Sequence, residues 1–199
     1  MTDSAQRTGN IKRQTKETDI DLGLLLDGRG QAVINTGVGF MDHMLTLLTV
    51  HGFFDLTINA RGDVQVDDHH TVEDLGICLG MGLKEAVGDM AGIRRYGYSY
   101  VPMDEALVRV CVDFSNRPYL HYDVAVRDQK VGSFDTSLAK EFLRALALHG
   151  GLTMHVDLLH GENTHHIIEA VFKALGKSLA AAVTKDFRVT GQLSSKGVL

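Results

Sequence analysis

The order of strands and helices expected in the first half of the chain recurs in the second half, and this repeat constrains the fold most. The first half runs strand, strand, helix, strand, helix, with the elements expected at 19–36 (both strands), 39–54, 55–60 and 69–89. The second half runs in the same order, at 106–126 (both strands), 137–151, 152–160 and 165–183. A repeat of this kind indicates two copies of one structural unit.

The repeat predicts an α+β fold of two tandem pseudo-symmetric halves. Each half is expected to form a small, mainly four-stranded sheet with two helices packed on one face. Within 19–36 the turn signal Asp27-Gly28-Arg29-Gly30 predicts that the two strands form a hairpin. The expected boundaries are a disordered tail at 1–10, a first half at 11–91, a second half at 92–186, and a C-terminal tail at 187–199 that contributes to the functional site.

Composition narrows the classes of function. The formal net charge of −5 and the pI near 6.0 argue against a broad basic face for nucleic acid. No apolar run approaches the ~20 residues of a membrane-spanning helix, so we expect no membrane partner. Cys78 and Cys111 both lie in apolar runs. They are interpreted as buried free thiols in a reducing compartment, which makes the cytoplasm the expected location.

Two histidine pairs, each followed by a glutamate, lie at equivalent positions of the repeat. In "DDHHTVED" the pair precedes Glu73, and in "NTHHIIEA" it precedes Glu169. Adjacent residues of a helix point about 100° apart, whereas residues i and i+4 share a face. His69 with Glu73, and His165 with Glu169, can therefore bind one cation. A single histidine pair more often caps a helix, but two repeat-related copies favour a site for Mn, Fe or Zn.

The unpaired histidines suggest two pseudo-equivalent sites that each combine residues of both halves. His43 in "MDHM" corresponds to Glu141 in "KEFL" and supplies a further candidate ligand. The predicted sets are His43, His70, His165 and Glu169 for one site, and Glu141, His69, His166 and Glu73 for the other. Four protein ligands leave coordination positions open if the ion is six-coordinate.

Cationic and hydroxyl groups at several places suit a phosphate, which requires convergent donors and positive charge. These candidates are Arg95, Arg117, Lys173, Ser195 and Lys196. Each cationic group taken singly also fits the reading of a solvated charge, and for Arg95 the spacing alone favours neither reading. His51 ends a helix, where it interacts with the helix dipole or touches a ligand. Glu17 alone is an ordinary exposed glutamate, and His121, His155 and His160 have no motif context and are interpreted as structural.

Together these motifs resemble the imidazoleglycerol-phosphate dehydratase family. The resemblance rests on "GFMDHML", "DDHHTVEDLGICLG", "GIRRYG", "MDEAL", "NTHHIIEAVFKALGKSLAAAV" and "SSKGVL" and covers nearly the whole chain. It implies a hydro-lyase of histidine biosynthesis that converts D-erythro-imidazole-glycerol phosphate to imidazole-acetol phosphate. It also implies two Mn²⁺ ions per active site and a homo-oligomer of 24 subunits built from trimers, with sites at subunit contacts.

The resemblance further assigns roles to individual residues. It implies that an imidazolate and a diazafulvene-like intermediate form, and that Glu17 in "TKETD" is the base. It places Arg95, Arg117, Lys173, Ser195 and Lys196 at the phosphate end of the substrate. Glu105, which is equivalent to Glu17 in the repeat, is a weaker candidate for proton handling. The chain has Glu141 where some members of the family have histidine, and this difference bears on metal affinity more than on metal identity.

Two other functions remain as alternatives. A metallohydrolase would present a similar site but release a cleaved fragment rather than an enolisable ketone. A non-enzymatic metal-bridged assembly or storage protein would use the histidine pairs as bridges between subunits. It would not need the phosphate-binding set, so Lys196→Ala would have no effect on its function.

Overall fold

The computed structural model describes residues 6–197 as strands and helices in a repeating order. The strands are β1 (Thr8–Gln14), β2 (Thr18–Leu25), β3 (Ala32–Asn35), β4 (Asp55–Gly62), β5 (Tyr96–Met103), β6 (Ala106–Asp113), β7 (Tyr119–Asp123), β8 (Lys130–Val131), β9 (Phe134–Asp135) and β10 (Thr153–His160). The helices are α1 (Gly39–Gly52), α2 (His69–Val87), α3 (Leu138–Gly150) and α4 (Thr164–Val183).

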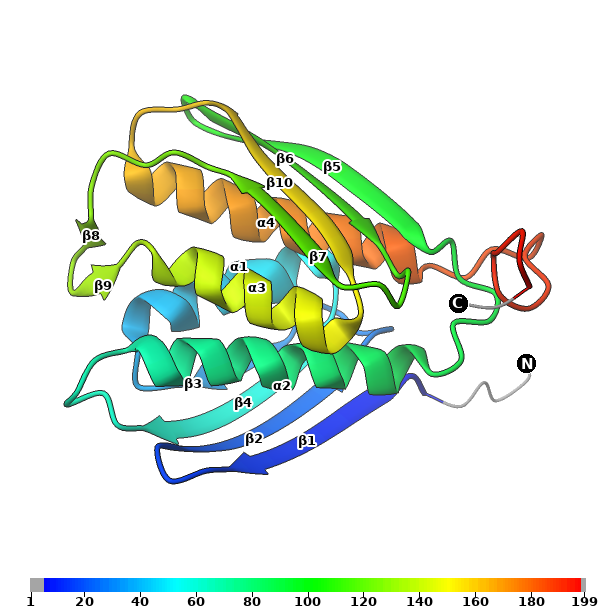
Figure 1. Cartoon of the computed structure of the whole chain (residues 1–199), viewed down its shortest axis with the longest axis horizontal. Helices are drawn as coiled ribbons and strands as arrows, with labels where there is room; N and C mark the ends of the chain where they lie inside the picture. The colour runs from blue at the N-terminus through cyan, green and yellow to red at the C-terminus, as the bar shows by residue number, and fades with distance from the viewer. Residues whose placement is uncertain (1–5, 198–199) are drawn as a thin grey trace.

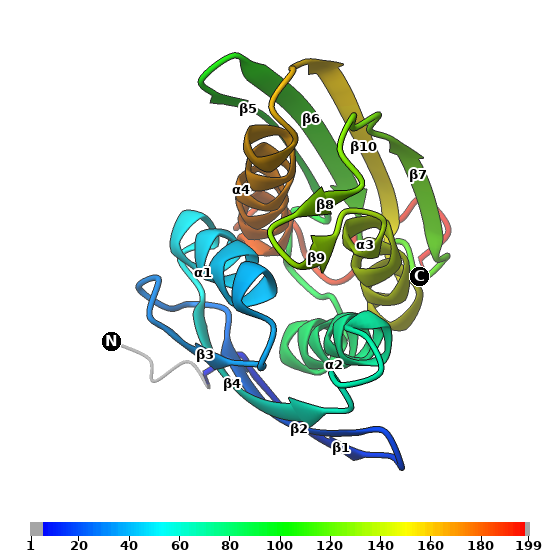
Figure 2. The same ribbon diagram turned by 90° about the vertical axis from the view of Figure 1, so that its left-hand side faces the viewer.

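The two halves form equivalent four-stranded sheets. The strand orders are β1-β2-β4-β3 and β5-β6-β10-β7, and in both sheets only the last pair is parallel. A short β8-β9 ribbon is added in the second half. The four helices lie together between the two sheets (Figures 1 and 2). The predicted α+β fold with two similar halves, each a four-stranded sheet with two helices on one face, is confirmed.

The predicted hairpin within 19–36 is wrong. β2 and β3 are not hydrogen-bonded to each other, because β4 lies between them and pairs with both. Ile58 of β4 is opposite Leu22 on one side and Ile34 on the other. The turn signal correctly marks the end of β2, but α1 then carries the chain back so that β4 enters the middle of the sheet. The second half follows the same path, with β10 between β6 and β7.

The first strand of each sheet was not predicted from the sequence. β1 starts at Thr8, so residues 8–10 of the expected disordered tail belong to the sheet, while residues 1–5 lie outside the described residues. β1 has few apolar residues because it is an edge strand whose outer face is exposed. β5, its counterpart, carries three exposed tyrosines on that face, Tyr96, Tyr98 and Tyr100.

One of the two expected buried thiols is only partly buried. Cys78 in α2 is fully enclosed, and this burial raises the pKa of its thiol to about 12. Cys111 lies on β6 at intermediate exposure. Alternate residues of β6 point away from the helices, and the odd-numbered position of Cys111 puts it on that side. Both cysteines are free thiols, as expected.

Close approach between sheet and helix depends on glycine at equivalent places in both halves. A side chain at Gly97 in β5 would overlap the carbonyl oxygen of Ser178 in α4. A side chain at Gly9 in β1 would overlap the carbonyl oxygen of Gly82 in α2. In each half the helix therefore rests directly on the backbone of the edge strand, and backbone atoms cannot move aside as a flexible side chain could.

We expect Gly97→Ala to destabilise the protein by about 1–3 kcal/mol, because the added methyl group forces β5 and α4 apart. Urea denaturation at fixed protein concentration measures the loss. Gly39→Ala is the matched control, since its Cβ would meet nothing within 4 Å at the start of α1, and its effect should stay within about 1 kcal/mol. Equal stability of the two variants would contradict the proposed close packing.

Among residues 6–197, no helix is long and apolar enough to span a membrane.

Candidate metal centre

Both histidine pairs occupy the first turn of a helix, and polar residues just before them fix their positions. The Asn163 side chain accepts hydrogen bonds from the backbone N–H groups of His165 and His166 at the start of α4. Asp67 accepts one from the backbone N–H of His69 at the start of α2. The Asp and Asn of "DDHH" and "NTHH" thus satisfy helix donors that would otherwise be unpaired.

Within each pair the two rings point apart, as the helical geometry predicts. The ring centroids of His69 and His70 are 6.2 Å apart at 81°, and those of His165 and His166 are 6.3 Å apart at 84°. The i, i+4 partners come together instead. His165 Nε2 lies 3.3 Å from Glu169 Oε2, and His69 Nε2 lies 3.8 Å from Glu73 Oε2.

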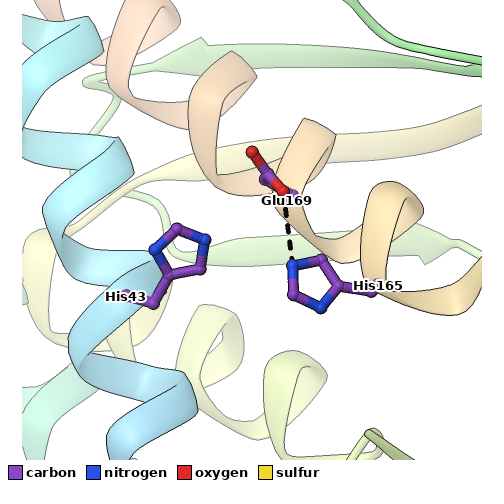
Figure 3. A group of neighbouring side chains, drawn as sticks. All are labelled: His43, His165 and Glu169. Carbon is purple, nitrogen blue, oxygen red and sulfur yellow. Dashed lines mark ion pairs between the residues drawn. The ribbon is translucent and has the colours of Figure 1, made fainter.

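Three predicted ligands converge between α1 and α4. One nitrogen or oxygen from each of His43, His165 and Glu169 lies within 4.8 Å of the other two. Figure 3 shows His43 reaching from α1 toward the two side chains of α4. The Glu169 side chain is only 10% exposed, while His43 and His165 are more accessible. Two imidazoles and one carboxylate at this spacing form a donor set that suits a divalent cation.

Basic groups adjoin this cluster on the next turns of the same helices. Lys173 Nζ lies 2.7 Å from Glu169 Oε1. Burial alone would raise the pKa of Glu169, but the hydrogen bond from Lys173, with His43 and His165 nearby, lowers it below its usual value. Burial and the charges of Lys173 and Lys177 lower the pKa of His51, so its ring is held in the neutral form. Lys173 thus adjoins the three-ligand cluster, and His51 lies two turns beyond His43 at the end of α1.

The pseudo-equivalent cluster between α2 and α3 contains an arginine. Glu73 and Glu141 both contact Arg144, whose Nη2 lies 3.1 Å from Glu73 Oε1 and 2.7 Å from Glu141 Oε2. His69 is the third member, next to Glu73. The Arg144 guanidinium lies between the carboxylates of Glu73 and Glu141, at the position that a cation bound by these two side chains would occupy. An open cavity of about 550 Å³ adjoins His69 and reaches the β8-β9 ribbon.

The remaining two histidines do not join the expected sets within one chain. His70 Nδ1 lies 3.0 Å from Asp63 Oδ2 and 3.9 Å from Glu17 Oε2. His166 Nδ1 lies 2.8 Å from Glu105 Oε2. The two four-residue sets predicted from the sequence are therefore each reduced to three residues, because the first turn of each helix directs its second histidine toward an acidic residue of a neighbouring loop.

These two histidines have equivalent acidic environments, and their pKa values respond in the same direction. The hydrogen bond with Asp63 raises the pKa of His70, and the hydrogen bond with Glu105 raises that of His166. The bond with His166 and the backbone N–H of Asn163 lower the pKa of Glu105 to about 2. Glu105 is thus engaged as a partner of His166 and as a cap for the loop before α4.

Glu17 is held at the tip of the β1-β2 turn with its carboxylate accessible. The Thr15 hydroxyl accepts hydrogen bonds from the backbone N–H groups of Glu17 and Thr18. The Glu17 side chain is 54% exposed and lines an open cavity of about 340 Å³ together with Asp63. An exposed carboxylate such as that of Glu17, close to His70, can exchange a proton with a molecule bound in this cavity.

The expected phosphate ligands fall into separate groups. Arg95 Nε and Nη2 donate to the two carboxylate oxygens of Asp113 at 2.6 and 3.0 Å, and Nη1 donates to the carbonyl oxygen of Leu193 at 2.7 Å. Arg95 is 7% exposed, so its guanidinium holds the C-terminal segment in place. Arg95 and Ser195 both line an open cavity of about 460 Å³. The next residue, Lys196, is exposed.

This group lies at the opposite end of α4 from the three-ligand cluster. The backbone N–H of Arg95 donates to the carbonyl oxygen of Ala182, and the rise of a helix separates Ala182 from His165 by about 25 Å. Arg117 is exposed in the β6-β7 turn, where its Nη1 donates to the carbonyl oxygen of Ser115 at 3.3 Å. The cation cluster and the C-terminal group of one chain cannot serve the same small molecule.

Two partners in these clusters were missed by the sequence analysis. Asp63 and Arg144 have no motif. Asp63 lies in the loop between β4 and α2, seven residues before His70, and Arg144 comes from α3, 71 residues after Glu73. The spacing of Arg144 from Glu141, at i and i+3 on a helix, is the one local signal that could have indicated the second contact.

Comparison with known proteins places this arrangement in a family. A family model described as imidazoleglycerol-phosphate dehydratase matches residues 36–179. A relative of that description from Desulfotalea psychrophila is 55% identical over 193 residues, covering 97% of this chain and 96% of the relative. One from Halalkalibacterium halodurans is 57% identical over 193 residues, covering 97% of this chain and 100% of the relative.

Solved structures have the same fold. The crystal structure of imidazoleglycerol-phosphate dehydratase from Staphylococcus aureus has a TM-score of 0.82 and 45% identity, covering 90% of this chain and 99% of the other. A crystal structure of IGPD from Pyrococcus furiosus has a TM-score of 0.83 and 42% identity, covering 95% of this chain and 100% of the other.

Proposed function

Because the chain belongs to the imidazoleglycerol-phosphate dehydratase family of hydro-lyases in histidine biosynthesis, we propose that it carries out this dehydration with the help of divalent cations. The substrate is D-erythro-imidazole-glycerol phosphate, and the products are imidazole-acetol phosphate and water. The observation that carries the proposal is the convergence of His43, His165 and Glu169 between two helices. These three residues would hold the ion at the ring end of a phosphorylated imidazole, whereas the candidate phosphate ligands of the same chain lie at the other end of α4.

The residues present fit a cation of the manganese, iron or zinc class. The fit rests on the donors: imidazole nitrogens and carboxylate oxygens without thiolates. His43, His165 and Glu169 would hold one ion, and His69, Glu73 and Glu141 a second once Arg144 moves aside. We propose two Mn²⁺ ions per active site. When bound, such ions act as Lewis acids and position the imidazole ring of the substrate.

Glu17 is the proposed base. The hydroxyl next to the ring departs, and Glu17 accepts the proton from the neighbouring carbon, so hydroxide and proton together account for the water released. The enol that results becomes the ketone of the product. The support for this role is an accessible carboxylate held by the Thr15 turn and facing His70. Glu105 is fully engaged with His166 and the loop before α4, which makes it a positioning residue.

We further propose that the complete site forms between copies of the chain. In one chain the phosphate candidates Arg95, Ser195 and Lys196 lie at the other end of α4 from the cation cluster, and His70 and His166 point away from it. Contact between copies would bring these groups together, and this supports a homo-oligomer. The number of 24 subunits and their assembly from trimers are proposed from the family resemblance alone. Lys173 lies beside the cluster and would meet the substrate there, and we propose that His51, at the end of the same helix as His43, also contacts it. The cytoplasmic location stays a prediction.

Turnover by metal-stripped protein tests the proposal. We expect imidazole-glycerol phosphate to be converted to the enolisable ketone only after Mn²⁺ is added back, because ring positioning needs the ion. The control is stripped protein to which Mg²⁺ alone is added, since Mg²⁺ binds imidazole nitrogen poorly. Full activity without any metal would contradict cation dependence. A cleaved fragment in place of the ketone would favour the metallohydrolase alternative, and bound metal without turnover would favour the assembly protein.

A further inference from the structure

Two histidines and two aspartates occupy neighbouring positions on the outer face of the second sheet. β7 and β10 are parallel neighbours, and their register places His155 opposite His121 and Asp157 opposite Asp123. Met154 and Val156 of β10 are buried against the helices, so the residues that alternate with them point outward. We call His121, Asp123, His155 and Asp157 the outer-face cluster.

The nitrogen and oxygen atoms of the outer-face cluster are close enough to share one ion but too far apart for tight ion pairs with each other. One atom from each of His121, Asp123 and Asp157 lies within 4.8 Å of the other two. His121 Nε2 is 3.5 Å from Asp157 Oδ1, which is longer than an ordinary hydrogen bond. The rings of His121 and His155 have centroids 5.4 Å apart at 33°, so the second imidazole stands beside the first.

Arg109 neutralises only part of the acidic charge. Its Nε and Nη2 both donate to Asp157 Oδ2, at 3.1 and 3.0 Å. This leaves Oδ1 of Asp157 directed toward His121. Among residues 6–197, Asp123 forms no ion pair with an arginine or a lysine. With both histidines neutral, the two carboxylates and one guanidinium leave a net negative charge, which favours a cation.

We propose that the outer-face cluster binds one divalent cation of the zinc or cobalt class. Two imidazoles and two carboxylates supply four ligands, the number that zinc prefers. Ligand bonds of about 2.0–2.2 Å require the side chains to draw together by roughly an ångström, which rotation of exposed rings allows. The ion would tie the edge strand β7 to β10.

This site is separate from the candidate metal centre. His43, His165 and Glu169 belong to α1 and α4, which pack on the inner face of the sheets, whereas the outer-face cluster lies on the side turned away from the helices (Figure 2). Binding at one place therefore does not require the other, and variants of the outer-face cluster leave the proposed dehydration machinery intact.

Zinc binding by the full-length protein tests the proposal. We expect His121→Ala and Asp123→Asn each to bind one zinc ion fewer per chain than the wild type in equilibrium dialysis at micromolar Zn²⁺. His160→Ala is the matched control, because this exposed histidine also belongs to β10 but lies outside the cluster, and it should bind as much zinc as the wild type. Anomalous diffraction at the zinc edge should place the additional ion between His121 and Asp157.

The outcomes separate clearly. Loss of one ion in both cluster variants, with unchanged dehydratase activity after Mn²⁺ loading, supports a distinct site. Equal zinc content in the wild type and both variants would overturn it, as would an equal loss in His160→Ala. An anomalous peak of undiminished height in His121→Ala would also overturn it, since loss of one of the four proposed ligands should weaken binding of the ion.

Discussion

Replacing Glu17 by Gln is expected to lower kcat by about 10²–10⁴-fold, which is the range for loss of a general base. The amide keeps the size of the side chain but cannot accept the substrate proton. The turn itself should be unaffected, because the Thr15 hydroxyl binds the backbone of Glu17 rather than its carboxylate. Steady-state kinetics on the Mn²⁺-loaded protein measures the effect.

The metal content of Glu17→Gln separates a base from a residue that supports the cation site. Glu17 lies 3.9 Å from His70 and contacts none of His43, His165 and Glu169 in the convergent cluster, so the variant should bind as much manganese as the wild type. Asp19→Asn is the matched control: it removes an exposed carboxylate two residues further along and should retain full activity. Unchanged kcat in Glu17→Gln, or an equal loss in Asp19→Asn, would refute the assignment.

Asp113→Ala is expected to destabilise the fold by about 3–5 kcal/mol, because it leaves the buried Arg95 guanidinium without its carboxylate partner. The two side chains are only 8% and 17% exposed, so water cannot replace the lost contact. The free energy of unfolding in urea, at fixed protein concentration, reports the change. The C-terminal segment should also become more accessible to protease, since Arg95 binds the carbonyl oxygen of Leu193.

An exposed ion pair provides the control for this prediction. Lys12 and Asp21 are 84% and 58% exposed and join β1 to β2. Asp21→Ala should change the free energy of unfolding by no more than about 1 kcal/mol, the usual value of a surface pair. If Asp113→Ala were no more destabilising than Asp21→Ala, the pair of Arg95 and Asp113 would not hold the fold together.

Much of the fold could be predicted because the helices and the inner strands carry clear apolar periodicity. α1 and α3 were found with their glycine ends, and the histidine pairs were correctly placed at the starts of α2 and α4. β1 and β5 were missed because both have an exposed outer face and few aliphatic residues, whereas β3 and β7, which are also edge strands, were expected after turn signals. The strand order was missed because a turn signal shows where a strand ends and not which strand becomes its neighbour.

The candidate site divides in the same way. The spacing of His69 with Glu73 and of His165 with Glu169 follows from helix geometry, so the sequence predicted both contacts. The approach of His43 to α4 depends on how α1 packs, although the repeat suggested it. The placement of Arg95 against Asp113 and of His70 against Asp63 had no local signal, because each partner lies on a different strand or loop.

The sequence by itself determined the repeat, the helical faces and the i, i+4 ligand pairs, because these depend on residues a few positions apart and on fixed backbone geometry. Only the tertiary structure decided which strand lies in the middle of each sheet, which acidic group meets each remaining histidine, and that His121 and His155 stand side by side. Most of these contacts join residues far apart in the chain, such as His166 with Glu105, and the contact of His70 with Asp63 depends on how the loop before α2 folds back. They form where burial of whole helices and sheets is most favourable, and no short stretch of sequence encodes that balance.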